Sequence, residues 1–283
     1  METRARNIRA AMIATVSYAV FAVSDALVKL LSQTLPVIQV TFMVTGIALI
    51  LLFIHAAITG QMNKVVPRHP LFAITRALLL AGDTILIYYA FANLPLAEVY
   101  VLAFLTPILV AALAVVLLKE RLSLIASIGV ILGFAGVLVT LRPGVATIGL
   151  GHIAALASVG MYAATLLMLR VAKPDETDMA LVATNFVFLT VMAIAMTVFS
   201  TGLQPVTMLE LFYATLDGAC IFAGAMWIVK AFRMGNASLV APFQYTQIIW
   251  GGLLGLFLFG DPVEMHTMIG AVIIILSGWL VLK

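Results

Sequence analysis

Residues 90–136 read AFANLPLAEVYVLAFLTPILVAALAVVLLKERLSLIASIGVILGFAG, and residues 231–277 read AFRMGNASLVAPFQYTQIIWGGLLGLFLFGDPVEMHTMIGAVIIILS. The two stretches align without a gap, with 141 residues between paired positions such as 90 and 231. Pairs of like character are Ala90 and Ala231, Val99 and Val240, Ile108 and Ile249, Leu117 and Leu258, Glu120 and Asp261, and Gly129 and Gly270. The same shift carries every other apolar segment of the first half onto one in the second. The chain is therefore expected to hold two copies of one structural unit.

The composition indicates that both units lie in a membrane. Hydrophobic residues make up 64% of the chain and charged residues 10%, and the mean hydropathy is +1.20. A helix needs about 20 apolar residues to cross a bilayer. The segments that meet this requirement are residues 8–32, 36–58, 70–91, 97–118, 122–141, 149–171, 179–200, 209–233, 238–259 and 263–282. We predict an all-α integral membrane protein with ten transmembrane helices in two five-helix repeats, residues 1–143 and 144–283.

The cations lie on one side of this arrangement. If the N-terminus faces the cytoplasm, every Lys and Arg except Lys29 and Arg142 falls at or near a cytoplasmic helix end. This asymmetry follows the positive-inside rule and places both termini in the cytoplasm. Because five helices per repeat is an odd number, the two repeats must insert in opposite orientations. The net charge of +3 thus reflects topology, and it does not indicate nucleic acid as a partner.

Inverted repeats of apolar helices are typical of secondary transporters, whose substrate site lies between the repeats. We expect alternating access around a central cavity that binds a small-molecule substrate. The short linkers leave no room for a soluble nucleotide-binding domain, and no cofactor is implied. Ten helices are sufficient for a monomer surrounded by the lipid bilayer.

Several motifs resemble a known family. Leu105-Thr106-Pro107, then Leu117-Leu118-Lys119-Glu120-Arg121-Leu122, then Gly129, Gly133 and Gly136 resemble an EamA domain of the drug/metabolite transporter superfamily. The second copy reads Phe257-Leu258-Phe259-Gly260-Asp261-Pro262, followed by Gly270 and Gly278, with Asp261 where Glu is more usual. The resemblance covers the whole chain. Within the superfamily the chain is most similar to the YddG-like branch of amino-acid exporters.

This resemblance carries further expectations. It implies export of neutral or aromatic amino acids and related metabolites across the bacterial inner membrane. It also implies a cavity between the first four helices of each repeat, with the fifth helix of each repeat at the periphery. Relatives in the superfamily carry drugs, purines, nucleotide sugars and other metabolites.

Asp83 is the deepest acid, near the middle of its helix, and Arg76 lies seven residues earlier on the same face. A charge inside hydrocarbon costs about 2.5–3.5 kcal/mol, so a charged residue there is expected to have a functional or structural role. In one interpretation Asp83 lines the cavity, where it binds a substrate ammonium group or titrates during transport. In the other it forms a structural ion pair or is solvated by water.

An amide and aromatic wall is expected on the ninth helix. Gln244 and Gln247 are three residues apart, and an amide that faces lipid is costly, so both should face the bundle interior. Trp250 lies near the same face. The remaining candidate substrate residues are Tyr89, Tyr162, Trp227 and Tyr245. The alternative is that aromatic residues form interfacial belts and the glutamines join helices; Tyr88 and Tyr100 fit such belts.

Other charged residues suggest gating or structural roles. Asp25 and Lys29 have i,i+4 spacing and can pair on one helix face. Glu120 and Asp261 close corresponding helices, where each can pair with a cation or accept hydrogen bonds from the next helix. Asp217 is expected to be a solvated charge near a helix end.

The backbone adds two further devices. Pro107 and Pro242 lie in the fourth and ninth helices, where a missing N–H donor allows a bend. Gly129-x-x-x-Gly133 and Gly251-x-x-x-Gly255 are patterns of close helix contact.

Two other functions fit the sequence less well. A proton-coupled exporter of drugs or other lipophilic cations would use the same fold and a membrane carboxylate. An intramembrane aspartyl enzyme would use Asp83 in Ala81-Gly82-Asp83, but the expected first glycine is Ala and no partner motif exists. The histidines, which are His55, His69, His152 and His266, show no ligand spacing, so no metal is expected.

Overall fold

The computed structural model describes residues 2–106, 108–109, 113, 124–142, 148–173, 175–234 and 241–281. Helices account for almost all of them. The first repeat contains α1 (Glu2–Leu31), α2 (Val37–Ile58), the short 3-10 helix η1 (Met62–Lys64), α3 (Pro70–Asn93), α4 (Leu96–Ala103) and α6 (Leu124–Leu141). The second contains α7 (Leu150–Val171), α8 (Asp178–Met196) with η2 (Thr197–Thr201), α9 (Met208–Met234), η3 (Ala241–Thr246), α11 (Gln247–Leu254), η4 (Gly255–Phe259) and α12 (Met265–Val281). The all-helical prediction is confirmed for the described residues.

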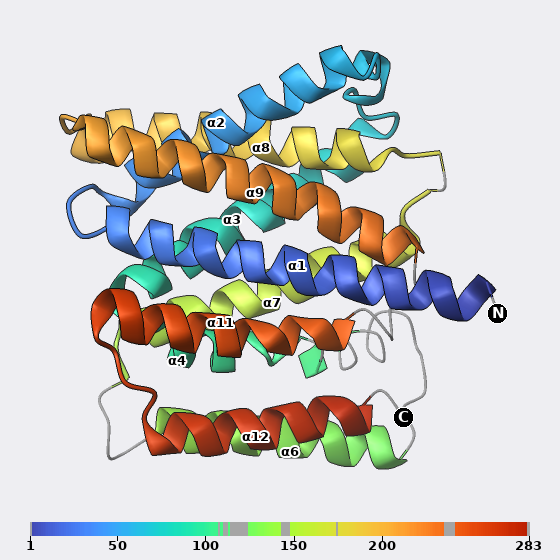
Figure 1. The fold of residues 1–283 in the computed structure, drawn as a ribbon, viewed down its shortest axis with the longest axis vertical. Coiled ribbons are helices and arrows are strands. Elements are labelled where there is room, and N and C mark those ends of the chain that lie inside the picture. The colour runs from blue at the N-terminus through green and yellow to red at the C-terminus, as the bar shows by residue number, and fades with distance from the viewer. Residues whose placement is uncertain are drawn as a thin grey trace.

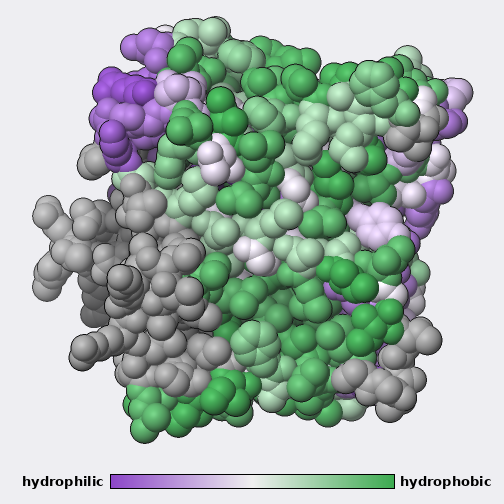
Figure 2. All heavy atoms as spheres, turned by 180° about the vertical axis from the view of Figure 1, so that it is seen from behind, coloured by the Kyte–Doolittle hydropathy of each residue, from purple (hydrophilic) through white to green (hydrophobic). Residues whose placement is uncertain are grey.

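Each apolar segment expected from the sequence contains helix. Within the described part of the chain, five helical stretches are long and apolar enough to cross a membrane: Ile8–Leu31, Val37–Ile58, Pro70–Asn93, Asp178–Phe199 and Met208–Ile228. Figure 2 shows that apolar side chains cover the broad middle of one face, while hydrophilic ones gather toward its edges. This distribution is that of a protein whose middle lies in hydrocarbon.

The helices pair in a pattern that is unchanged when the two repeats are exchanged. Under the sequence shift, α1 corresponds to α7 and α3 to α9, and the structure packs α1 on α9 and α3 on α7. The pairs α2–α8 and α6–α12 each join corresponding helices, and α4 packs on α11, which belongs to the corresponding apolar segment of the second repeat. Figure 1 places α6 and α12 together at one end of the long axis, apart from the central α1, α3, α7 and α9. The peripheral position expected for the fifth helix of each repeat is therefore correct.

The two ends of the bundle are distinguished by the chain termini. Helix α1 begins and α12 ends at the same side, which we call the terminal end (Figure 1). The opposite side, where α1 ends at Leu31 and α3 ends at Asn93, is the far end.

The helix of the fourth segment is interrupted after α4, because residues 104 and 105 form a turn. Helix α4 ends at Ala103, and Pro107 has no N–H to donate to the Ala103 carbonyl. The Thr106 hydroxyl donates to that carbonyl at 2.7 Å instead. In the second repeat the ninth segment is helical throughout 241–259, as a 3-10 helix, an α-helix and a π-helix in succession. Pro107 and Glu120 themselves lie outside the described residues.

Glycines allow the closest helix contacts. A Cβ atom at Gly133 would lie 2.1 Å from Ile108 Cδ1, and one at Gly251 would lie 1.8 Å from Tyr100 Cε2. At Gly255 the nearest atoms are 3.9 Å away, which is ordinary contact. The expected role in close packing thus holds for Gly133 and Gly251 and is wrong for Gly255. The α6–α12 crossing relies in addition on Gly136 and Gly270.

Gly270→Ala is expected to lower the stability of the bundle. The new methyl group would lie 2.0 Å from Thr140 Oγ1 and 2.9 Å from the Gly136 carbonyl oxygen. Overpacking of this kind costs about 1–3 kcal/mol, so the midpoint of thermal unfolding in detergent should fall. The control is Gly160→Ala, because a Cβ atom there meets nothing within 4 Å. Equal midpoints for the two variants would contradict the close α6–α12 contact.

Candidate functional site

Three carboxylates lie inside the bundle, one on each of α1, α3 and α9. Asp25 Oδ2 accepts a hydrogen bond from the Tyr100 hydroxyl at 2.6 Å. Asp83 Oδ1 accepts one from Ser158 Oγ at 2.6 Å. Asp217 Oδ1 accepts one from Ser24 Oγ at 2.5 Å, and Asp217 is fully buried. Each acid thus receives a neutral hydroxyl donor from a different helix, and for Asp83 and Asp217 the donor comes from the other repeat.

Tyrosines lie near these acids. Tyr88 is 5% exposed, and the charges of Asp25, Asp83 and Asp217 all act on its hydroxyl. Tyr162 lies near Asp83 on one side and near Tyr18 on the other. We call Asp25, Asp83 and Asp217 the acid cluster. Because residues of both repeats surround it, it lies where a transporter of this architecture would bind its substrate.

The ion pair between Asp83 and Arg76 is absent, since no Arg76 nitrogen lies within 4.0 Å of an Asp83 oxygen. Arg76 lies instead near Tyr162 and Asp178, and its Nε atom is buried without a hydrogen-bond partner. Asp83 is only partly covered. The interpretation of Asp83 as half of a structural ion pair with Arg76 is therefore wrong for this conformation.

The two glutamines of the ninth segment are in the interior, as expected. Gln244 in η3 and Gln247 at the start of α11 are each 9% exposed. Both elements pack against α1, and Phe243 packs against the cluster that contains Tyr18. The amides are thus held on the α1 side of the bundle.

The other aromatic candidates are more open. Trp227 and Trp250 are each 39% exposed, and Tyr89 is 36% exposed. Of the substrate residues expected from the sequence, the structure brings Asp83 and Tyr162 within electrostatic reach of each other. The side chains of Tyr245 and Pro242 are not among those described, although both residues belong to η3.

Lys29 joins three chain segments at the far end. Its Nζ atom donates to Asp261 Oδ2 at 2.6 Å and to the Leu94 carbonyl at 3.0 Å. It also lies 4.9 Å from the centre of the Phe259 ring. Helix α1 is thereby tied to the α3–α4 connection and to the segment that precedes α12. The expected Asp25–Lys29 pair is wrong, because each residue has a different partner.

Two other expectations also fail. Asp217 is not a solvated charge at a helix end, since the α1–α9 contact covers it completely. Tyr100 and Tyr88 are not interfacial belt residues; they are 2% and 5% exposed and lie in the main core. The spacing of these residues along single helices carried no information about which neighbouring helix would cover them.

Sequence reasoning missed the hydroxyl donors Ser24 and Ser158, together with Tyr18. Serine is common in membrane helices as a packing residue, so neither serine stood out. Their signal was position: Ser24 precedes Asp25, and Ser158 lies one turn before Tyr162. A serine or tyrosine hydroxyl that can donate a hydrogen bond to each buried acid was the feature that would have revealed them.

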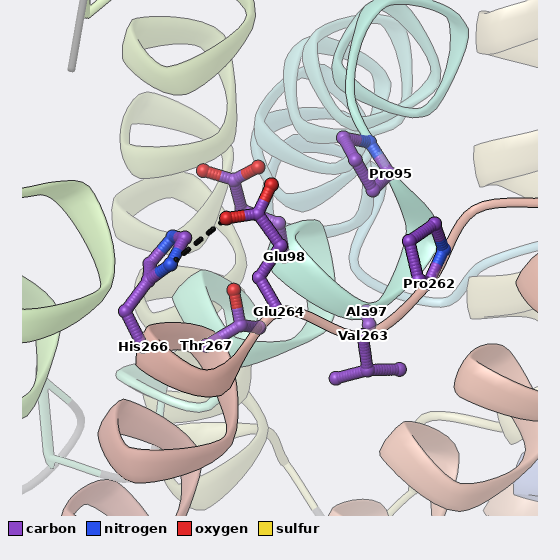
Figure 3. A pocket seen from close by; sticks show the side chains of 8 residues that line it. All are labelled: Pro95, Ala97, Glu98, Pro262, Val263, Glu264, His266 and Thr267. Atoms are coloured by element: carbon purple, nitrogen blue, oxygen red, sulfur yellow. Dashed lines mark ion pairs between the residues drawn. The ribbon is translucent and has the colours of Figure 1, made fainter.

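A second polar group lies at the far end, where the starts of α4 and α12 meet. Glu98 Oε1 lies 3.0 Å from His152 Nε2, and Glu264 Oε2 lies 3.1 Å from His266 Nδ1. The pocket in Figure 3 is lined by Pro95, Ala97, Glu98, Pro262, Val263, Glu264, His266 and Thr267. Its volume of about 20 Å³ accommodates a single water molecule, not an organic solute.

The sequence matches the model of the EamA-like transporter family twice, over residues 8–142 and 149–283. The chain belongs to this family. The two matches account for nearly the whole sequence, and they place its function among small-molecule transporters of the membrane. Part of the resemblance inferred from the motifs is thereby confirmed.

Relatives in the family have several named functions. The chain is 24% identical to a pseudopaline exporter of Pseudomonas aeruginosa, over 94% of this chain and 93% of that protein. It is 24% identical to an S-adenosylmethionine uptake transporter of Rickettsia bellii, over 89% of this chain and 86% of that protein. A solved structure shares the fold with a TM-score of 0.67 at 19% identity, covering 96% of both chains. None of these similarities singles out the YddG-like branch.

The effects of replacing Lys29 and Asp261 on the free energy of unfolding are expected to be coupled. In a double-mutant cycle of Lys29→Met and Asp261→Asn, thermal unfolding should give a coupling free energy of about 0.5–3 kcal/mol, because the charges are partly shielded from water. The control is the Arg68–Asp175 pair, which is 4.0 Å long with side chains 65% and 48% exposed. Its coupling should stay below about 0.5 kcal/mol. Additive effects at Lys29 and Asp261 would show that the pair does not hold the far end together.

Proposed function

We propose that this EamA-family protein is a secondary transporter that exports small neutral or aromatic amino acids and related metabolites by alternating access. The observation that carries the proposal is the acid and tyrosine centre enclosed by α1, α3, α7 and α9, helices that pair symmetrically between repeats. Buried polar groups are costly in a membrane and usually mark a substrate or ion pathway. The protein would act as a monomer without a cofactor.

The centre suits a zwitterionic solute with an apolar side chain. Asp83 would bind the ammonium group, since its carboxylate is partly accessible and has no cation within ion-pair distance among the described residues. Gln244 and Gln247 would donate hydrogen bonds to the solute carboxylate. The aromatic residues would contact its side chain; they are Tyr89, Tyr162, Trp227, Tyr245 and Trp250.

Alternating access would use the symmetry of the two repeats. Ten membrane spans in repeats 1–143 and 144–283, inserted in opposite orientations, allow one site to open to either side by tilting one repeat against the other. The Lys29–Asp261 ion pair links α1 of the first repeat to the segment before α12 of the second. We propose that it is a gate at the far end, which faces outward if both termini are cytoplasmic. Arg76, Asp25 and the prolines would support this movement.

The direction of transport would follow from the driving gradient. One relative is named as an exporter and another as an uptake transporter, so the shared fold supports both directions. A protein without coupling carries solute down whichever gradient exists.

A second candidate is a proton-coupled exporter of drugs or other lipophilic cations. Its support is the acid cluster, since carboxylates in a low-dielectric centre attract cations strongly. The two candidates differ in cargo: the first requires a zwitterion and the second a net positive charge.

Flux measurements in proteoliposomes decide between them. Labelled neutral and aromatic amino acids should enter with saturable kinetics and show counterflow, whereas acidic ones should not. The same vesicles are tested with tetraphenylphosphonium and with an imposed proton gradient. Saturable flux of this cation without amino-acid flux would favour the second candidate, and no flux of either solute would contradict both.

Asp83→Asn and Gln244→Ala are expected to reduce the amino-acid flux at low solute concentration by at least about tenfold, equivalent to about 1.4 kcal/mol of lost interaction. Each removes one group that the proposal assigns to the solute. Asp175→Asn and Gln61→Ala are matched controls, because these residues lie in connections at the terminal end. Unchanged flux in the two centre variants would contradict the assignment of the cavity.

A further inference from the structure

The carboxylate of Asp217 is incompletely satisfied. Its Oδ1 atom accepts from Ser24, but its Oδ2 atom is buried without a hydrogen-bond partner. A buried charged oxygen that lacks a partner costs more than a normal hydrogen bond returns. A proton or a bound cation at this oxygen would relieve that cost.

Asp25 follows Ser24, the donor to Asp217, and Asp83 lies near Asp25. The charge of Asp25 acts on Asp217, and the charge of Asp83 acts on Asp25. All three act on the Tyr88 hydroxyl. Each acid has one neutral hydroxyl donor, from Ser24, Tyr100 or Ser158. A neutral donor orients a carboxyl group but does not cancel its charge.

No cation of the described residues lies within ion-pair distance of the acid cluster. Lys29, one turn from Asp25, is occupied by Asp261 and the Leu94 carbonyl. Arg76 lies two turns from Asp83, toward Tyr162 and Asp178. Since a charge in hydrocarbon is costly, three uncompensated carboxylates in one place are strongly disfavoured.

The described surroundings of Asp217 supply no other base or cation. Helix α2 approaches at Gly218 with Ile47 and the Val44 carbonyl. Cys220 on α9 lies near the Asp217 carboxyl group. The titratable groups that face the cluster from α1, α3, α4, α7 and α9 are Asp25, Tyr88, Asp83, Tyr100, Tyr162, Asp217 and Cys220.

We propose that Asp25, Asp83 and Asp217 form a proton-binding site at the centre of the bundle, and that this site couples solute movement to the proton gradient. Protons occupy the carboxyls in the absence of solute and leave to water when the ammonium group of the solute enters. The entering ammonium group displaces one proton, and it then pairs with the carboxylate that this proton has left. The coupling rests on the proposed function, whereas proton binding by the cluster does not.

Chemical labelling tests proton binding without any solute. Dicyclohexylcarbodiimide reacts with a carboxyl group in apolar surroundings only when it carries a proton, and leaves a stable N-acylurea. In the wild-type protein in lipid nanodiscs, mass spectrometry should find this adduct on Asp217 at about pH 7 and at least about tenfold less at about pH 10. Exposed Asp175 should remain unlabelled at both. No adduct on Asp217 at the lower pH, or equal labelling at both, would overturn the proposal.

Coupling is tested with a pH-sensitive dye trapped in proteoliposomes. Addition of phenylalanine or tetraphenylphosphonium should move protons in the wild type and in Asp175→Asn, and at least about tenfold fewer in Asp217→Asn. Labelling without proton movement, in vesicles that do transport solute, would overturn the coupling and leave the proposed function standing. If no solute is transported at all, the proposed function fails and the labelling result still decides proton binding. Ser24→Ala, which retains the acid and removes its donor, replaces Asp217→Asn if the latter does not fold.

Discussion

A polar group in hydrocarbon must find its partner within the protein, and most features of this structure follow from that constraint. The backbone meets it by forming helices wherever the chain is apolar. The side chains meet it by contacts between helices: Ser24 reaches Asp217, Tyr100 reaches Asp25, and Lys29 reaches Asp261. Two of these pairs join different helices, and the third joins α1 to the segment before α12. Two of the three connect the two repeats, so polar contacts add to the apolar and glycine contacts that hold the repeats together.

The duplication explains the order of packing. A helix of one repeat contacts its counterpart, or the counterpart of its neighbour, in the other repeat. The internal symmetry is one of helices and not of polar residues: under the sequence shift, Asp83 has Gly224 as its counterpart, and Asp217 has Arg76. The two ends of the bundle consequently differ in chemistry, with the ion pair of Lys29 at only one of them in the part of the chain that the structure describes.

Much of this architecture was predictable from the sequence, because helix length and repeat depend on apolar runs that are visible residue by residue. The inward position of Gln244 and Gln247 was predictable for the same reason: an amide has no place in lipid. The interaction partners of the charged side chains were not predictable. Asp25 and Lys29 share a helix face, yet each pairs with a residue from elsewhere in the chain, and no pattern within one helix reveals that partner. Asp217 was misplaced because its burial depends on α1, which is distant in sequence.

The contact between Tyr100 and Gly251 links packing to chemistry. The ring of Tyr100 lies so close to α11 that only a hydrogen atom fits at position 251, while its hydroxyl holds Asp25 on α1. One side chain therefore contacts both repeats: its ring packs against the second repeat, and its hydroxyl binds an acid of the first. A tilt of α11 would therefore shift the ring and withdraw the donor from Asp25. The position of α11 in the second repeat and the hydrogen bonding of an acid in the first repeat would then change together.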